Sequence, residues 1–170
     1  TVFKISMLVL NFVISIAFLF VPFSYYIFVD PNDIDIWWFK MNEVYPPKLF
    51  QSTAFLAALG FLYIQYYMIF ELGSLDTKLT TEYSLILISS LIWCPATYFS
   101  LKKSKKLKFV VVMVLGITAG SSLAFIYFLF ERHKQSLQRD LAIVAMSLFS
   151  FHVTFVDFFV WNFFYLKNLR

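Results

Sequence analysis

The sequence predicts an all-α fold, namely a polytopic membrane helical bundle with about five transmembrane helices and a short interfacial amphipathic helix. Two observations carry this prediction. Of the 170 residues, 61% are hydrophobic and only 14% are charged, whereas soluble domains have about 45–50% apolar and about 25% charged residues. The charged residues also leave five long stretches of the chain almost uncharged. We therefore expect residues 1–170 to form a single integral membrane domain.

Each uncharged stretch is long enough to cross a bilayer as a helix. A crossing needs about 20 apolar residues, because a helix rises about 1.5 Å per residue and the hydrocarbon layer is about 30 Å thick. A helix also satisfies its own backbone hydrogen bonds in lipid, and these stretches lack the alternation of barrel strands. The sequence predicts spans near 5–29, 49–70, 83–101, 109–130 and 141–166.

Two of these spans have alternatives. The span at 83–101 is the shortest and contains Pro95, which removes a backbone donor and predicts a kink. A tilted or re-entrant segment is the alternative for it. The span at 5–29 is too long for a signal peptide, and it ends at Asp30 and Pro31 rather than at a small-residue cleavage site.

The connection after the first span predicts an interfacial helix near 34–45. Apolar residues recur there at helical spacing, and Trp37 and Trp38 are among them. Tryptophan is enriched at the headgroup level, so both residues are expected to anchor this helix at the membrane surface. A gate or a docking surface is the alternative role.

The lysine hairpin at 102–108 determines the predicted orientation. It places five lysines within seven residues between two spans, and cytoplasmic loops carry an excess of such residues. Counting spans from there puts the C-terminus in the cytoplasm and the N-terminus outside. Anionic headgroups account for the net charge of +4, so the expected partner is the lipid bilayer and not nucleic acid.

Asp157 is the only acid inside a predicted span. A carboxylate at the bilayer centre costs about 2.5–3.5 kcal/mol, so it is expected to face the bundle interior. At about 100° per residue, Ser147, Ser150 and Thr154 share its side of the helix. The sequence therefore predicts one polar stripe that points inward.

The same geometry separates two other polar residues from this stripe. His152 projects almost opposite Asp157, and Asn162 lies to one side. We therefore expect His152 and Asp157 to contact different helices rather than to form a pair.

The stripe has two interpretations. In the first it is a proton or cation site, because loss of water favours the neutral form of a buried acid, and Gln65, Tyr66 or Asn11 on another helix completes the path. In the second it is a set of interhelical hydrogen bonds, each worth only about 0.6 kcal/mol.

Small residues on the fourth span predict close helix packing. Gly116 and Gly120 form a GxxxG pair, and Ala124 extends the small face by a turn. This face packs either within its own bundle or against another copy of the chain.

Motifs for nucleotide binding, zinc proteolysis and serine hydrolysis are absent from the sequence. Cys94 is the only cysteine and therefore cannot form an internal disulfide. We expect no cofactor and no metal, and the sequence favours a non-enzymatic role.

Three functions remain. The first is a transport or channel-type protein that moves protons or small cations past Asp157. The alternative is an accessory or assembly subunit of a larger membrane complex. A third is a lipid-binding protein or lipid-modifying enzyme that uses the acidic segment 30–43.

Overall fold

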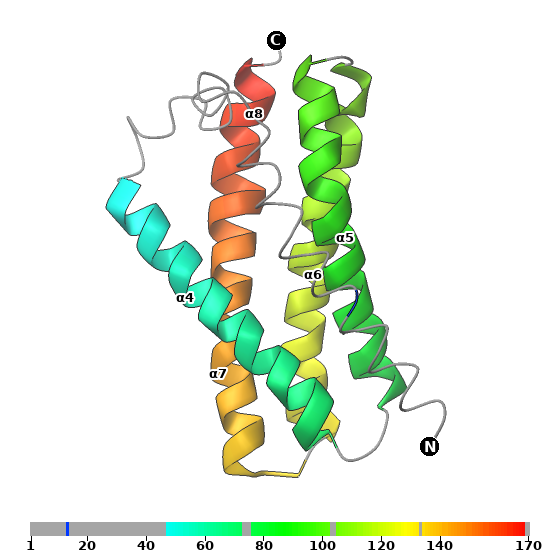
Figure 1. Ribbon diagram of the computed structural model, residues 1–170, viewed down its shortest axis with the longest axis vertical. Coiled ribbons are helices and arrows are strands. Elements are labelled where there is room, and N and C mark those ends of the chain that lie inside the picture. Colours follow the sequence, from blue (N-terminus) through cyan, green and yellow to red (C-terminus); the bar gives the residue numbers. More distant parts are fainter. Residues whose placement is uncertain (1–12, 14–46, 73–75, 103–104, 133, 169–170) are drawn as a thin grey trace.

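The computed structural model describes residues 13, 47–72, 76–102, 105–132 and 134–168. Within these residues all regular secondary structure is helical (Figure 1), which confirms the predicted all-α class. The predicted span at 5–29, apart from Val13, and the predicted interfacial helix near 34–45 lie outside the described residues.

The helices join into four long rods. The first rod is α4 (Pro47–Tyr66) continued by the π-helical turn η1 (Tyr67–Glu71). The second and third are α5 (Thr77–Lys102) and α6 (Lys108–Arg132), with the 3₁₀-helix η2 (Lys105–Leu107) between them. The fourth consists of α7 (Leu137–Phe151), the π-helix η3 (His152–Trp161) and α8 (Asn162–Asn168).

Each rod is long and apolar enough to cross a membrane. The qualifying stretches are Ser52–Glu71, Thr77–Ser100, Lys108–Glu131 and Leu137–Lys167. They coincide with four of the predicted spans, so four rather than about five are found in the described residues. The stretch predicted at 83–101 has the length for a full crossing, because α5 continues through Pro95.

The first turns of three helices leave few backbone N–H groups without a hydrogen-bond partner. Pro47 opens α4, where its missing N–H group costs no hydrogen bond. The Asp76 carboxylate accepts hydrogen bonds from the N–H groups of Lys78 at 2.9 Å and Leu79 at 3.2 Å. Ser136 caps α7 and accepts a hydrogen bond from the Arg139 N–H group at 3.2 Å.

The rods pack as antiparallel neighbours. α5 lies along α6, α6 lies along the rod of α7 and η3, and α4 crosses α7 obliquely (Figure 1). One apolar core joins α4, α5, α6 and α7 through fully buried residues such as Ile64, Leu87, Phe125 and Met146. A second, smaller core around Trp161 joins α5, α6, η3 and α8.

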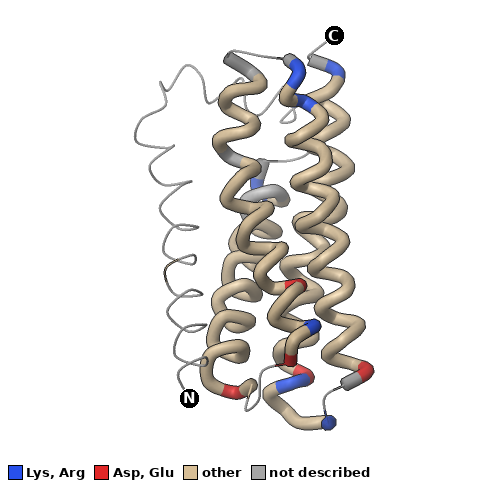
Figure 2. Tube along the Cα trace, turned by 90° about the vertical axis from the view of Figure 1, so that its right-hand side faces the viewer, with Lys and Arg blue, Asp and Glu red and all other residues tan. Residues whose placement is uncertain are grey.

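The outer surface of the bundle is apolar, and its charges gather at the ends. Large hydrophobic side chains such as Phe55, Phe109 and Phe163 are more than half exposed, as expected for a surface that faces lipid. Figure 2 shows basic residues at the end near the C-terminus, which includes the start of α6 and Lys167, and a mixture of acidic and basic residues at the other end.

Candidate functional site

The crossing of α4 and α7 shapes the interior of the bundle. Gly60 of α4 lies so close to α7 that a Cβ atom there would overlap the carbonyl oxygen of Ala145. From this contact the two rods diverge, and the N-terminal half of α4 tilts away from the fourth rod (Figure 1). The divergence leaves space between α4 and the other three rods.

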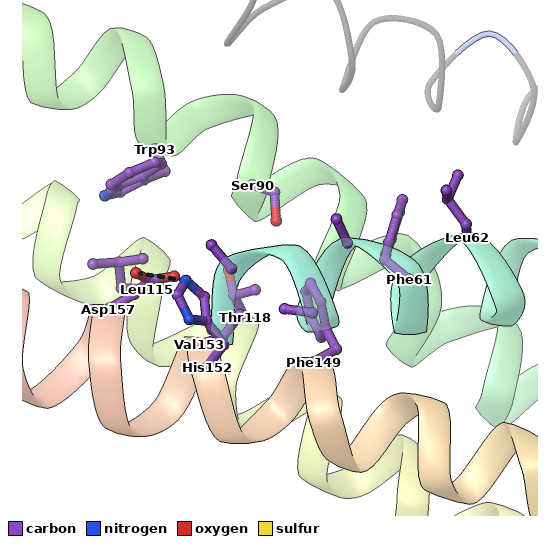
Figure 3. A pocket seen from close by; sticks show the side chains of 13 residues that line it. Phe61, Leu62, Ser90, Trp93, Leu115, Thr118, Phe149, His152, Val153 and Asp157 are labelled. Carbon is purple, nitrogen blue, oxygen red and sulfur yellow. Dashed lines mark ion pairs between the residues drawn. The ribbon is translucent and has the colours of Figure 1, made fainter. Parts of the chain in front are cut away.

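That space contains a cavity of about 270 Å³. Its walls come from all four rods and are mostly apolar (Figure 3). Four lining side chains are polar, and these are Ser90, Thr118, His152 and Asp157. The other nine are Ala54, Ala57, Ala58, Phe61, Leu62, Trp93, Leu115, Phe149 and Val153.

His152 and Asp157 form a pair on the wall of this cavity. Nε2 of His152 lies 3.6 Å from Oδ1 of Asp157 (Figure 3), and the Asp157 side chain keeps 19% of its surface exposed. The prediction that the two residues do not form a pair is therefore wrong. In an α-helix they would point about 140° apart, but they belong to η3, and a π-helix bonds residue i to i+5, which aligns residues five apart.

Thr53 of α4 extends this pair to a second rod. Its hydroxyl oxygen lies 3.1 Å from Nδ1 of His152, and the hydroxyl donates to the Leu49 carbonyl at 3.0 Å. A hydroxyl has one proton, so while it donates to Leu49 its oxygen accepts from the Nδ1–H group of His152. Nε2 of His152 then faces the Asp157 carboxyl across 3.6 Å, which is longer than a hydrogen bond but short enough for an ion pair when the ring is protonated.

The register of the two rods explains why Thr53 and His152 meet. Thr53 lies seven residues before Gly60, and His152 lies seven residues after Ala145. Seven residues make about two helical turns. The two helices run antiparallel and touch at Gly60 and Ala145. A position two turns before Gly60 on α4 therefore lies beside a position two turns after Ala145 on the fourth rod.

The other residues of the predicted stripe do not join Asp157 at the cavity. Ser147 is exposed and donates to the Ile143 carbonyl at 2.7 Å, so the prediction that it points inward is wrong. Ser150 is buried and Thr154 is half-buried, but neither lines the cavity. The stripe is divided because Ser147 precedes the change to π-helical geometry and Asp157 follows it.

Four predicted or neighbouring polar groups are enclosed without a hydrogen-bond partner among the described residues. They are the hydroxyls of Ser150 and Thr154, the side-chain amide nitrogen of Gln65 and the side-chain amide of Asn162. Gln65 and Asn162 also lie outside the cavity wall. The structure therefore does not bring Gln65 to Asp157 as part of one path.

The predicted small-residue face has two environments. A Cβ atom at Gly116 would lie 3.3 Å from the ring of Phe158, so Gly116 accommodates this side chain of η3 within the bundle. Gly120 is exposed, and a Cβ there would meet no atom within 4 Å. Ala124 is half-buried. Trp37, Trp38 and the acidic segment 30–43 lie outside the described residues.

Several residues of the site, namely Thr53 beside His152 and the cavity-lining Ser90, Trp93 and Thr118, were not predicted from the sequence. Thr53, Ser90 and Thr118 are short hydroxyl residues that are common in apolar helices, and Thr118 pairs with Ser89 across α5 and α6 at 2.7 Å. Trp93 did not stand out because aromatic residues make up 22% of the sequence. In the part of the chain that the structure describes, no three His, Cys, Asp or Glu side chains come together as metal ligands would.

Comparison of the chain with known protein families, curated proteins and solved structures gives no match. Any functional conclusion therefore depends on the cavity and on the polar groups in its wall.

Proposed function

We propose that this chain is a small multi-pass integral membrane protein of the transport or channel type, which moves protons or small cations past Asp157. The observation that carries the proposal is the contact of Asp157 with His152 in the wall of an internal cavity. An intramembrane acid is costly, and such residues commonly mark ion or proton pathways.

The geometry gives a proton two alternative positions within a few ångströms. One is the carboxyl of Asp157 and the other is Nε2 of His152, 3.6 Å away. The Thr53 hydroxyl fixes the opposite ring nitrogen and connects the site to the N-terminal half of α4. A proton that enters the cavity can therefore be held at Asp157 and passed to the imidazole, whereas a small cation would be held by the ionised carboxylate.

The proposed orientation places the lysine hairpin 102–108 and the C-terminus in the cytoplasm and the N-terminus outside. It is supported by the gathering of basic residues at the end of the bundle that holds the C-terminus (Figure 2). Cytoplasmic loops are enriched in Lys and Arg, and anionic headgroups on that side would hold these lysines.

Flux into liposomes tests the proposal. The purified protein is reconstituted into liposomes that contain either a pH-sensitive or a Na⁺-sensitive dye, and initial proton and Na⁺ flux are recorded under a fixed diffusion potential. We expect Asp157→Asn to reduce flux at least tenfold, because the amide keeps the shape and cannot ionise. Asp140→Asn is the matched control, since this acid lies in the first turn of α7 and is half exposed. Equal flux for Asp157→Asn and the wild type would reject the role of Asp157.

A second candidate function is that of an accessory or assembly subunit that packs against another membrane helix. It is favoured by Gly120, because the open space beside this exposed glycine admits the close approach of a neighbouring helix backbone. In a Cys94→Ser background, Gly120→Cys should form a disulfide-linked dimer if two copies meet at this face. A chain that stays monomeric under oxidation would remove the face as a contact between copies.

A further inference from the structure

The cavity beside Asp157 combines one ionisable acid with walls that solvate small ions poorly. Nine of its thirteen lining residues are Ala, Phe, Leu, Val or Trp, and none is Lys or Arg. Its polar groups other than the acid are the side chains of Ser90, Thr118 and His152 and the indole N–H of Trp93. A small hydrated ion would lose most of its water against these walls and gain few ligands in return.

A metal ion is a poor match for the same reason. Calcium takes six to eight oxygen ligands, and magnesium requires near-octahedral geometry. The cavity wall offers one carboxylate, one imidazole and two hydroxyls, and one of these hydroxyls, on Thr118, already bonds to Ser89 and to the Val114 carbonyl. The chemistry of the wall therefore suits a cation that brings its own apolar surface.

The size of the cavity limits such a ligand. A cavity of about 150 Å³ holds one benzene molecule, so about 270 Å³ accommodates one ring together with a short arm. Aromatic side chains from three rods, Phe61, Trp93 and Phe149, line the space and offer ring faces to a ring or to an ammonium group (Figure 3).

We propose that the cavity binds an apolar organic amine in its ammonium form, with the charged nitrogen at Asp157 and the apolar body between α4 and α7. Oδ1 of Asp157 lies 3.6 Å from Nε2 of His152, and 19% of the Asp157 side-chain surface remains exposed, which leaves room for an ammonium group beside the carboxylate. Phe61, Leu62 and Phe149 would surround the apolar body. The inference rests on the proposed function, because it uses the same cation site at Asp157, and it narrows the cations of that proposal to organic ammonium ions.

Equilibrium binding to the full chain in zwitterionic nanodiscs tests this without any flux measurement, so a failure to bind amines is distinct from a failure to move protons. The probes are radiolabelled 2-phenylethylamine and its neutral relative of the same size, 2-phenylethanol. We expect saturable binding of one amine per chain, with at least tenfold preference over the alcohol. Asp157→Asn should remove that preference and leave alcohol binding within threefold, while Asp140→Asn should leave both ligands unchanged.

A second variant tests the cavity itself. Ala58 lines the space from α4, and Ala58→Phe should fill it and weaken both ligands at least tenfold. Thermal unfolding of each variant confirms that it is folded. If Asp157→Asn does not fold, the wild-type protein alone tests the proposal. A preference of the wild-type protein for the amine over the alcohol that is below threefold then overturns it. Equal loss of both ligands in folded Asp157→Asn, or unchanged amine binding in Ala58→Phe, also overturns it.

Discussion

Gly60 of α4 and Ala145 of α7 are in backbone contact, with no room for a side chain between them. At this contact α4 crosses the fourth rod (Figure 1), and the cavity is lined by α4 residues on both sides of Gly60 and by fourth-rod residues that follow Ala145. The position of the candidate site therefore depends on a glycine that takes no part in its chemistry.

Gly60→Ala should destabilise the bundle, because the new methyl group would overlap the Ala145 carbonyl and force the two helices apart. Overpacking of this kind costs about 1–3 kcal/mol. The matched control is Gly120→Ala, where the methyl meets open space and the higher helix propensity of alanine gives a gain of up to about 1 kcal/mol. Reversible unfolding in mixed SDS micelles measures both, and equal stability of the two variants would contradict the crossing described here.

Substitution of Thr53 should change proton flux, because Thr53 orients the His152 ring. Thr53→Val keeps the shape and removes the oxygen that holds Nδ1 of His152, so the ring loses its orientation toward Asp157. A hydrogen bond is worth about 0.5–1.5 kcal/mol, which corresponds to roughly a twofold to tenfold loss of proton flux. Thr53→Ser keeps the hydroxyl and should retain most of the wild-type rate. A valine variant as active as the serine variant would show that this contact does not orient the imidazole.

The four described rods could be predicted from the sequence, because uncharged length alone predicts a helix long and apolar enough to cross a membrane. The site was harder to predict. The pairing of His152 with Asp157 depends on ten residues of π-helix, and nothing in the periodicity of the sequence indicates a change from 3.6 residues per turn. Gly60 was missed because its partner, the backbone of Ala145, leaves no residue pattern.

Ser100 of α5 and Tyr165 of α8 should stabilise the basic end of the bundle. Their hydroxyls are hydrogen-bonded and almost fully buried, and the Tyr165 ring stacks on Trp161. Tyr165→Phe leaves the Ser100 hydroxyl buried without this partner, which costs about 1–3 kcal/mol. Adding Ser100→Ala should restore part of that loss in a double-mutant cycle. Tyr127→Phe is the control, since Tyr127 is largely exposed, and a loss as large there would mean that the effect is not specific to the buried pair.

The two ends of α6 should be accessible from opposite sides of the membrane. Lys108–Glu131 has 24 residues, which at about 1.5 Å per residue exceeds the thickness of about 30 Å of the hydrocarbon layer. In a Cys94→Ser background, single cysteines at Ser104, before α6, and Gln135, after it, report the two sides. A membrane-impermeant maleimide added to intact cells should label Gln135→Cys and spare Ser104→Cys until the cells are opened. Labelling of Ser104→Cys alone would reverse the proposed orientation, whereas labelling of both from outside would contradict a crossing by α6.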